Sequence, residues 1–210
     1  MYKLYWARNT AAFAPEAVLV AAALPYERVP IDLGRAENRT PAYLAVNPAG
    51  YLPALVTPEG EVVHEAAAIV LYLCDRHGLD LVPPAGAPER GFFYCALFYM
   101  TNTLQEAYKL YYYPARFAGE AADLAATRAR ALALLQTRWA VVEDLLKPRA
   151  GPFFFGTRFG ALDIYLAMLA TWHPKEAELL AGLPAVKRCF EAAAAVPSLA
   201  QVLAWHRDGA

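Results

Sequence analysis

The chain has 210 residues, of which 58% are hydrophobic and 19% are charged, and its formal net charge is −1. This length suits one large domain or two small ones, and the apolar content favours a packed core over a disordered chain. The near-neutral charge argues against a nucleic-acid partner, which requires a concentrated basic surface.

The first part of the chain alternates strand and helix patterns. In chain order, the patterns predict a strand over 2–6, a helix over 16–23, a strand over 26–32, a short helical turn over 41–46, a strand over 52–56, a returning strand over 61–63 and a helix over 66–77. Pro15 occupies a first-turn position that tolerates proline, and Gly78 is a typical helix stop. The order β-α-β-α-β-β-α predicts a small α/β domain with a mixed sheet over residues 1–79.

The second part of the chain is different in kind. Residues 80–88 are rich in proline and alanine and read as a linker. Beyond them, strand patterns largely vanish, and helices are predicted over 89–113, 119–146, 162–172, 176–180, 184–195 and 198–205. The sequence therefore predicts an all-helical domain over residues 89–210.

Targeting segments and cysteines indicate the compartment. No run of about 18 apolar residues occurs, so we expect no membrane span. The apolar stretch 11–24 contains Pro15 and Glu16 and lacks a basic leader, which disfavours a signal peptide. The three cysteines are far apart and form neither a CxxC pair nor a metal-binding spacing. We expect free thiols, no metal and a cytoplasmic protein.

Residues 47–77 carry the most chemical information. Pro53 stands at the start of a predicted strand, where it removes one ladder donor and can adopt a cis peptide bond. A cis bond would turn the preceding backbone groups outward, free to pair with an extended peptide. The alternative is an ordinary trans proline at a sheet edge.

Glu65 comes directly before the predicted helix 66–77. A helix N-terminus presents unpaired N–H groups that bind carboxylates, and an acid beside it can accept a hydrogen bond from an ammonium group. A ligand with an amino group and a carboxylate on one carbon would satisfy both. The alternative is that Glu65 only caps its helix.

Short motifs along nearly the whole chain match one family. In the first half they are Lys3-Leu4-Tyr5, Leu24-Pro25-Tyr26-Glu27, Asn47-Pro48-Ala49-Gly50, Leu52-Pro53-Ala54-Leu55 and Glu65-Ala66-Ala67-Ala68-Ile69-Val70-Leu71-Tyr72-Leu73. In the second half they are Phe155-Gly156, Asp163-Ile164-Tyr165-Leu166-Ala167 and Trp172. The chain thus resembles the cytosolic glutathione transferases. The resemblance implies a thioredoxin-like N-terminal domain, a helical C-terminal domain, a homodimer, and glutathione as co-substrate.

The resemblance also implies which residues hold glutathione. The segment before the cis-proline, at Leu52 and Pro53, would bind the cysteinyl backbone, and Glu65 with Ala66 would hold the γ-glutamyl end. The family usually has Ser or Thr where Ala66 stands. The lost hydroxyl removes one neutral hydrogen bond, worth about 0.5–1.5 kcal/mol, which weakens binding up to roughly tenfold.

The thiol-activating group is less clearly marked. Many bacterial members carry Cys or Ser at positions matching Ala11 and Ala12, and both are absent here. Thr10, Asn9 and Tyr5 are the remaining candidates, because a hydroxyl or amide donor near sulfur stabilises the thiolate. The alternatives are turn and cap roles for Asn9 and Thr10, and core packing for Tyr5.

Tyrosines are dense between residues 108 and 113. Tyr108 and Tyr112 could wall an apolar site for an electrophilic co-substrate, as in the second site of the family, or could serve interface packing instead. Gly160 and Asp163 resemble the capping box of the family and indicate folding rather than chemistry.

Three functions remain open at this stage. The chain is expected to be an enzyme in which glutathione attacks a small electrophile, or a related thiol-dependent isomerase or reductase. It could instead be a non-catalytic ligand-binding or interaction protein on the same fold. A third possibility is the same fold with a different ligand. The sequence does not name the electrophile.

Overall fold

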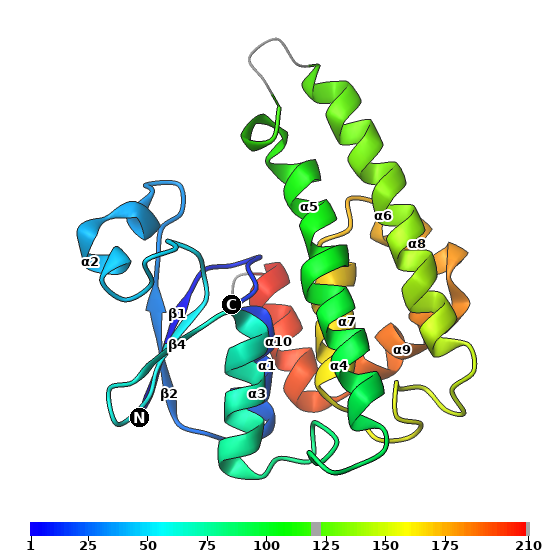
Figure 1. The fold of residues 1–210 in the computed structure, drawn as a ribbon, viewed down its shortest axis with the longest axis horizontal. Coiled ribbons are helices and arrows are strands. Elements are labelled where there is room, and N and C mark those ends of the chain that lie inside the picture. Colours follow the sequence, from blue (N-terminus) through cyan, green and yellow to red (C-terminus); the bar gives the residue numbers. More distant parts are fainter. Residues whose placement is uncertain (119–122, 209–210) are drawn as a thin grey trace. The chain divides into compact units, whose positions relative to one another are not determined.

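The computed structural model describes residues 1–118 and 123–208 (Figure 1). It consists of two compact units. Unit 1 comprises Met1–Val82 and Ala194–Ala210, and unit 2 comprises Pro83–Ala193. The last helix thus packs with the N-terminal half of the chain, whereas the domain boundaries inferred from sequence assign it to the helical half; those boundaries stay a prediction.

Unit 1 is built on a four-stranded mixed sheet. Its strands are β1 (Tyr2–Trp6), β2 (Tyr26–Pro30), β3 (Ala54–Val56) and β4 (Val62–His64). The spatial order is β2-β1-β3-β4, with β1 parallel to β2 and the other two pairs antiparallel. β1 alternates in burial at its start, with Tyr2 and Leu4 buried and Lys3 exposed, as the period-two pattern of a strand requires.

Four α-helices complete unit 1: α1 (Phe13–Ala21), α2 (Pro41–Leu44), α3 (Ala66–His77) and α10 (Pro197–Asp208). α1 and α3 cover one face of the sheet, and α2 lies on the other side (Figure 1). α3 buries Ile69, Val70 and Leu73 at helical spacing and ends at Gly78, whose φ of 59° suits glycine. α10 packs against α1.

Unit 2 is helical. A nearly continuous run comprises α4 (Arg90–Phe98), a π-helical segment (Tyr99–Leu104) and α5 (Gln105–Tyr112). It is followed by α6 (Leu124–Leu146), α7 (Ala161–Thr171), α8 (Glu176–Gly182) and α9 (Pro184–Ala194). α7 is buried over its whole length from Ala161 to Ala170 and forms the centre of this unit. A mostly apolar helix that is buried on all sides is expected only inside a core.

The fold class expected from sequence, α/β followed by all-α, is confirmed. The differences lie mostly at element ends. β3 begins after Pro53, because proline cannot donate to the ladder, and α1 already begins at Phe13, because Pro15 is tolerated in a first turn. The predicted helix 89–113 contains the π-helical segment, and the first four residues of the predicted helix 119–146 lie outside the described residues.

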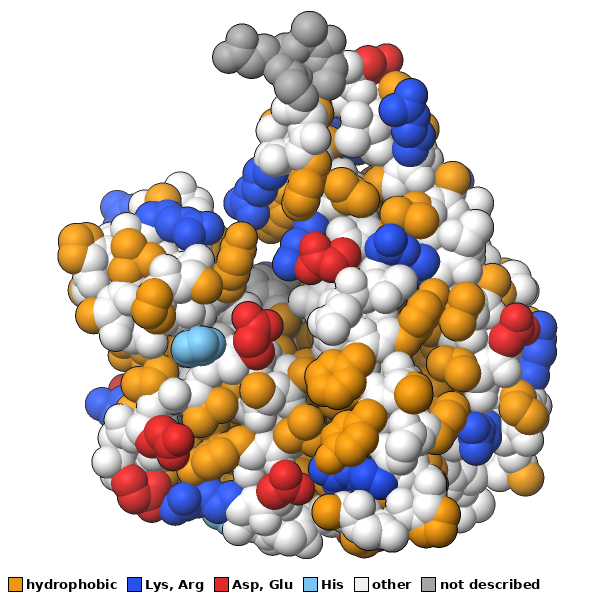
Figure 2. All heavy atoms as spheres, viewed as in Figure 1, with side chains coloured by type: hydrophobic (Ala, Val, Ile, Leu, Met, Phe, Trp, Pro, Cys, Tyr) orange, Lys and Arg blue, Asp and Glu red, His pale blue; other side chains and the backbone are white. Residues whose placement is uncertain are grey.

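In the described part of the chain, neither the helices nor the face shown in Figure 2 has a feature typical of a membrane-spanning or strongly charged protein. Within residues 1–118 and 123–208, no helix combines the length and apolarity needed to cross a bilayer. On the face shown in Figure 2, acidic and basic side chains are interspersed with apolar ones, in keeping with the net charge of −1.

Candidate functional site

The sheet register brings three loop segments together at one end of the sheet. Ala54 pairs with His64 and Tyr5 pairs with Ala54. The residues next to these pairs along the chain are Pro53, Glu65 and Trp6, so the segments that contain them lie at the same end of the sheet. The loop 7–12 leaves β1 from this end. The segments singled out in the sequence therefore converge within unit 1.

The loop before β3 is held from behind by side chains. The carbonyl of Tyr51 accepts hydrogen bonds from the Tyr43 hydroxyl (2.6 Å) and from Asn47 Nδ2 (2.8 Å). Asn47 Oδ1 also accepts from the Ala49 N–H (3.1 Å), forming an Asx turn. Burial, together with the neighbouring Tyr5, raises the pKa of Tyr43 to about 12 despite the bond with Asn47, so its hydroxyl stays protonated and donates.

Gly50 is required for this loop. Its φ is 66°, and a Cβ at this position would lie 2.9 Å from the carbonyl oxygen of Asn38. Asn38 Nδ2 donates to the Gly50 carbonyl at 2.7 Å. The Asn47-Pro48-Ala49-Gly50 motif is thus a rigid turn that delivers the chain to Leu52.

The Leu52–Pro53 peptide bond is cis. The backbone N–H and C=O of Leu52 form no hydrogen bond within the described part of the chain. Exposed, unpaired backbone groups beside a strand end can pair with an extended peptide in the manner of an added strand. This geometry fits the role that the sequence suggested for Leu52 and Pro53.

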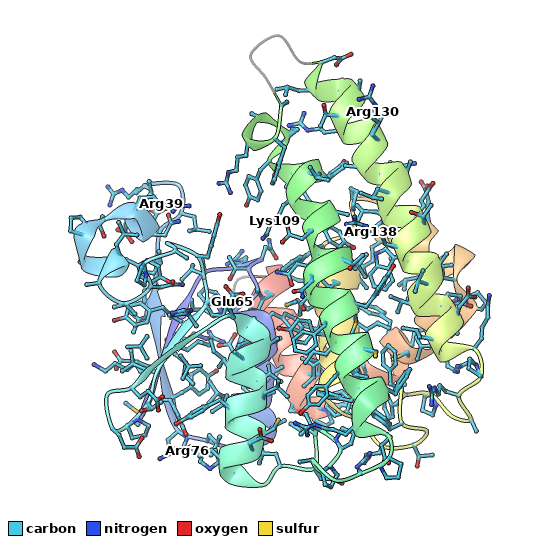
Figure 3. The ribbon with its side chains drawn as sticks, viewed as in Figure 1. Arg39, Glu65, Arg76, Lys109, Arg130 and Arg138 are labelled. Atoms are coloured by element: carbon cyan, nitrogen blue, oxygen red, sulfur yellow. The ribbon has the colours of Figure 1, made fainter. Side chains whose placement is uncertain are left out.

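Glu65 has an uncommon backbone conformation, and its carboxylate forms no hydrogen bond or ion pair with the residues that the structure describes. Its φ is 71° and its ψ is 114°, which is rare for a residue other than glycine and is often found at functional sites. Its side chain is exposed and does not cap α3. Figure 3 shows Glu65 at the N-terminal end of α3. The capping alternative for Glu65 is therefore not what the geometry displays.

Ala66 begins α3 with a buried side chain, 7% exposed. Because no side chain caps this helix, its first backbone N–H groups keep their donor capacity. The carboxylate of Glu65 and these N–H groups together match a ligand that carries an ammonium and a carboxylate.

The three candidate activating residues differ in how their donors are used. The Thr10 hydroxyl donates to the Ala7 carbonyl at 2.7 Å and accepts from the Ala12 N–H at 3.3 Å, which is a turn role. Asn9 is exposed, with a left-handed φ of 55°, and its side-chain amide forms no hydrogen bond among the described residues. Tyr5 packs edge-on against Tyr43, with ring centroids 5.5 Å apart.

The two candidate tyrosines of unit 2, Tyr108 and Tyr112, are held by their hydroxyls. Tyr108 is 3% exposed; its hydroxyl donates to the Leu169 carbonyl (2.6 Å) and accepts from Trp139 Nε1 (2.9 Å). Tyr112 is 45% exposed and donates to the Trp172 carbonyl (2.5 Å). Tyr112 therefore has an exposed ring, whereas Tyr108 lies in the core of unit 2.

Sequence reasoning missed a buried polar cluster behind the loop 7–12. The carboxylate of Glu16, which is fully buried, accepts from Trp6 Nε1 (2.9 Å), the Tyr26 hydroxyl (3.0 Å) and Arg28 Nε (2.5 Å). His206 of α10 lies 3.3 Å from the same carboxylate. One signal was available: Glu16 is the only charged residue in the apolar stretch 11–24.

The charge state of this cluster follows from its contacts. Burial by itself raises the pKa of Glu16, but the hydrogen bonds from His206, Arg28 and Tyr26 and the charge of Arg28 outweigh it, so the pKa is lowered. Burial and the neighbouring carboxylate raise the pKa of Tyr26. Glu16 is thus a buried carboxylate paired with the Arg28 cation. Among the residues that the structure describes, no group of three His, Cys, Asp or Glu side chains is arranged to hold a metal ion.

Comparison with known proteins places this geometry in a family. The family model "Glutathione S-transferase, N-terminal domain" matches residues 1–75. A zeta-class glutathione S-transferase of Euphorbia esula is 30% identical over 165 residues, which is 78% of this chain and 72% of that protein. The uncharacterized GST-like protein YncG of Escherichia coli (strain K12) is 26% identical over 204 residues, 97% of each chain.

A solved structure agrees with these relatives. The crystal structure of a glutathione transferase homologue from Sulfitobacter, with bound glutathione, superposes with a TM-score of 0.87 at 27% identity and covers 97% of each chain. The sequence relatives, the structural neighbour and the geometry at the end of the sheet lead to one conclusion. The chain belongs to the glutathione transferase family.

Proposed function

We propose that the protein is an enzyme of the glutathione transferase type, which binds glutathione on unit 1 and uses its thiolate to attack a small electrophile. The observation that carries this proposal is the convergence of Leu52, Glu65 and the loop 7–12 at one end of the sheet. Most of the groups involved are backbone groups, so the absence of a hydroxyl at Ala66 weakens binding without removing it.

Each group has a distinct role in the proposed complex. The Leu52 backbone beside Pro53 pairs with the cysteinyl unit of glutathione. The Glu65 carboxylate accepts from the γ-glutamyl ammonium group, and the Ala66 N–H at the start of α3 donates to the γ-glutamyl carboxylate. These contacts orient the ligand so that its sulfur faces the loop after β1.

Asn9 is the group that we favour for stabilising the thiolate. Its amide is exposed and without an intramolecular partner in the described chain, whereas the Thr10 hydroxyl already donates to the Ala7 carbonyl. Thr10 and Tyr5 remain the other candidates. A hydrogen bond that forms to the thiolate, but not to the thiol, lowers the thiol pKa and raises the fraction of nucleophile at neutral pH.

The exposed tyrosine Tyr112 of unit 2 is the part of the chain that we assign to the electrophile. Tyr112 supplies an exposed aromatic ring, and Tyr108 supports it from the core, where the two rings are stacked with centroids 6.5 Å apart. The electrophile is expected to be small and apolar.

Assembly and compartment belong to the same proposal. A homodimer is favoured by the family and by the stacked, exposed aromatic pair Tyr94 and Phe98 on α4. A cytoplasmic location is favoured by the free thiols of Cys74, Cys95 and Cys189. Sedimentation analysis and cell fractionation test these two points.

The function is tested by calorimetric titration with glutathione, by the ultraviolet absorbance of the bound thiolate, and by turnover of an activated aryl chloride. The proposal expects binding, a bound thiol whose pKa lies below that of free glutathione, and turnover. No binding at millimolar glutathione would overturn it.

A second function, a non-catalytic binding protein, is favoured by one specific observation. Ala11 and Ala12 are buried and lack any donor side chain where related proteins carry Cys or Ser. This reading expects glutathione to bind with an unshifted thiol pKa and without turnover, so the same titration separates the two.

A further inference from the structure

Among the described residues, the C-terminal helix α10 is joined to the loop 7–12 by a hydrogen bond from the loop to His206. The Asn9 N–H donates to His206 Nδ1 at 3.2 Å, across 197 residues of sequence. The other ring nitrogen of His206 lies 3.3 Å from Glu16 Oε2. All three residues belong to unit 1. A chain of hydrogen bonds therefore runs from the buried carboxylate, through the imidazole ring, to the backbone of the loop.

The contacts assign the tautomer of this histidine. Because Nδ1 accepts the Asn9 N–H, it carries no proton, so the proton of the neutral ring is on Nε2 and points to Glu16. Trp6 Nε1 lies 3.2 Å from His206 Nε2 but cannot donate to a protonated nitrogen. Its proton goes instead to Glu16 Oε2, at 2.9 Å. In this arrangement the Trp6 and His206 N–H groups both have Glu16 Oε2 as acceptor, whereas Arg28 Nη2 has no hydrogen-bond partner among the described residues.

Packing fixes the orientation of the ring. The His206 side chain is 5% exposed, and its ring meets Phe13 and Trp6 edge-on, at centroid distances of 5.0 and 5.3 Å. The neighbouring Trp205 stacks on the Arg28 guanidinium at 3.9 Å. The position of Nδ1 is thus set by α1, β1 and β2 rather than by the loop that it contacts.

We propose that His206 is a positioning residue for thiol activation. Its ring is anchored on Glu16 and holds the Asn9 backbone in the left-handed conformation. This conformation directs the side-chain amide of Asn9 toward the sulfur of glutathione. This inference rests on the proposed function and names a part of the site that lies outside its ligand-contacting groups. Asn9 has a left-handed φ of 55°, a conformation that Asn tolerates better than most residues with a Cβ. The hydrogen bond from its N–H to His206 Nδ1 adds to this tolerance and holds the backbone in that conformation.

Two variants separate the two hydrogen bonds of the ring. In His206→Gln, the side-chain amide reaches the position of Nε2, so it can still donate to Glu16 but leaves the Asn9 N–H without its acceptor. In His206→Asn, the shorter side chain places its oxygen near the position of Nδ1 and can accept from Asn9. Gln201→Ala, at an exposed position on the same helix, is the matched control.

The primary measurement is the pKa of the bound glutathione thiol, which is determined from the ultraviolet absorbance of the thiolate as the pH is varied. We expect His206→Gln to raise this pKa by about one unit and to lower kcat about tenfold, with a smaller change in the KM for glutathione. In His206→Asn, the thiol pKa and kcat should return toward the wild-type values. In Gln201→Ala, both should equal the wild-type values. Urea unfolding of all variants checks that stability does not explain the change.

Hydrogen exchange of the Asn9 backbone N–H tests its hydrogen bond to His206 without any ligand. We expect faster exchange in His206→Gln than in wild type and in Gln201→Ala. Unchanged exchange, or faster exchange with an unchanged thiol pKa, would overturn the positioning role. If the wild-type protein does not bind glutathione at all, the proposed function fails together with thiol activation, while the exchange experiment still decides whether His206 holds the loop.

Discussion

Glu65 combines an uncommon backbone conformation with an exposed carboxylate. It is exposed, adopts a positive φ and gives its carboxylate to no residue that the structure describes. We predict that Glu65→Ala weakens glutathione binding by about 10- to 100-fold, since a charge-assisted hydrogen bond contributes about 1.5–3 kcal/mol. Calorimetric titration measures the loss. Glu61→Ala, at an exposed position before β4, is the control and should bind like wild type.

Ala66 offers the opposite experiment, a gain of affinity. Ala66→Ser places a hydroxyl at the first position of α3, where related proteins have one, and should strengthen glutathione binding by a few-fold to about tenfold. Ala68→Ser, exposed in the same helical turn, has the same cost in helix propensity but no access to the ligand. Equal affinities for the two variants would contradict the proposed role of Ala66.

Glu16 links residue chemistry to stability. Its pKa is lowered in the folded state, so the folded protein holds fewer protons here than the unfolded chain. The stabilisation is therefore present above the usual value of 4.5 and is lost as the pH falls through the folded pKa. We predict that Glu16→Gln lowers the free energy of unfolding at pH 7 by about 1–3 kcal/mol, because Arg28, whose side chain is 28% exposed, loses its charged partner.

Urea unfolding at neutral and acidic pH checks this prediction. The wild type should lose stability on acidification below 4.5, and Glu16→Gln should lose less, because it lacks the titrating group. Glu27→Gln, on the exposed side of β2, serves as the control. A variant with the stability of the wild type at pH 7 would show that the buried pair contributes nothing.

At the scale of elements, α7 contains a buried carboxylate, Asp163, whose effect on stability changes with pH in the opposite direction to that of Glu16. Asp163 accepts from the N–H groups of Phe154 (3.1 Å) and Gly160 (2.8 Å) and from Cys189 Sγ (3.2 Å). Burial raises its pKa to about 6, although these bonds lower it. Between the usual 3.8 and 6, the folded state therefore holds more protons, and stability falls as the pH rises through this range.

We predict that Asp163→Asn removes this pH dependence between about 4 and 6 and destabilises α7 by about 1–3 kcal/mol, because an amide cannot accept from all three donors. Urea unfolding across this range gives both quantities. Asp144→Asn changes an exposed carboxylate on α6 and should keep the wild-type slope. Equal slopes for Asp163→Asn and wild type would contradict the assignment.

The elements that were predicted correctly show which structural information local sequence patterns contain. The helix 66–77 was predicted to the residue, because its apolar spacing and Gly78 are local signals. The two halves of the site, around Pro53 and Glu65, followed from turn and helix-start chemistry in the same way. The π-helical segment within 99–104 carries no such signal, because it interrupts a pattern that otherwise reads as one helix.

The contact between His206 and Asn9 could not be predicted from local patterns at all. It joins residues 197 positions apart, and a histidine in a C-terminal helix usually has no such role. Glu16 gave a weak signal as a lone acid in an apolar stretch, but its partners come from β1, β2 and α10. Tertiary packing alone brings these together, so the loop 7–12, where we propose thiol activation, was the least predictable part of the proposed site.

At the scale of the molecule, unit 1 is discontinuous in sequence, and this determines how its two parts can be separated. Residues 1–82 form the sheet, α1, α2 and α3, but α10 covers α1 and supplies His206 to Glu16. A fragment of residues 1–82 would expose the buried carboxylate and the apolar face of α1. We therefore predict that this fragment is markedly less stable than unit 1 in the whole chain.

Complementation tests this prediction. A synthetic peptide of residues 194–210 should bind the fragment 1–82, increase its circular dichroism signal and raise its midpoint of urea unfolding, since binding to the folded state alone stabilises it by mass action. The same peptide with His206→Ala should bind more weakly, because Glu16 and the Asn9 N–H each lose a partner. A fragment that is as stable without the peptide as with it would show that α10 does not stabilise the rest of unit 1. The contact of His206 with Asn9 would then be a consequence of the loop conformation rather than its cause.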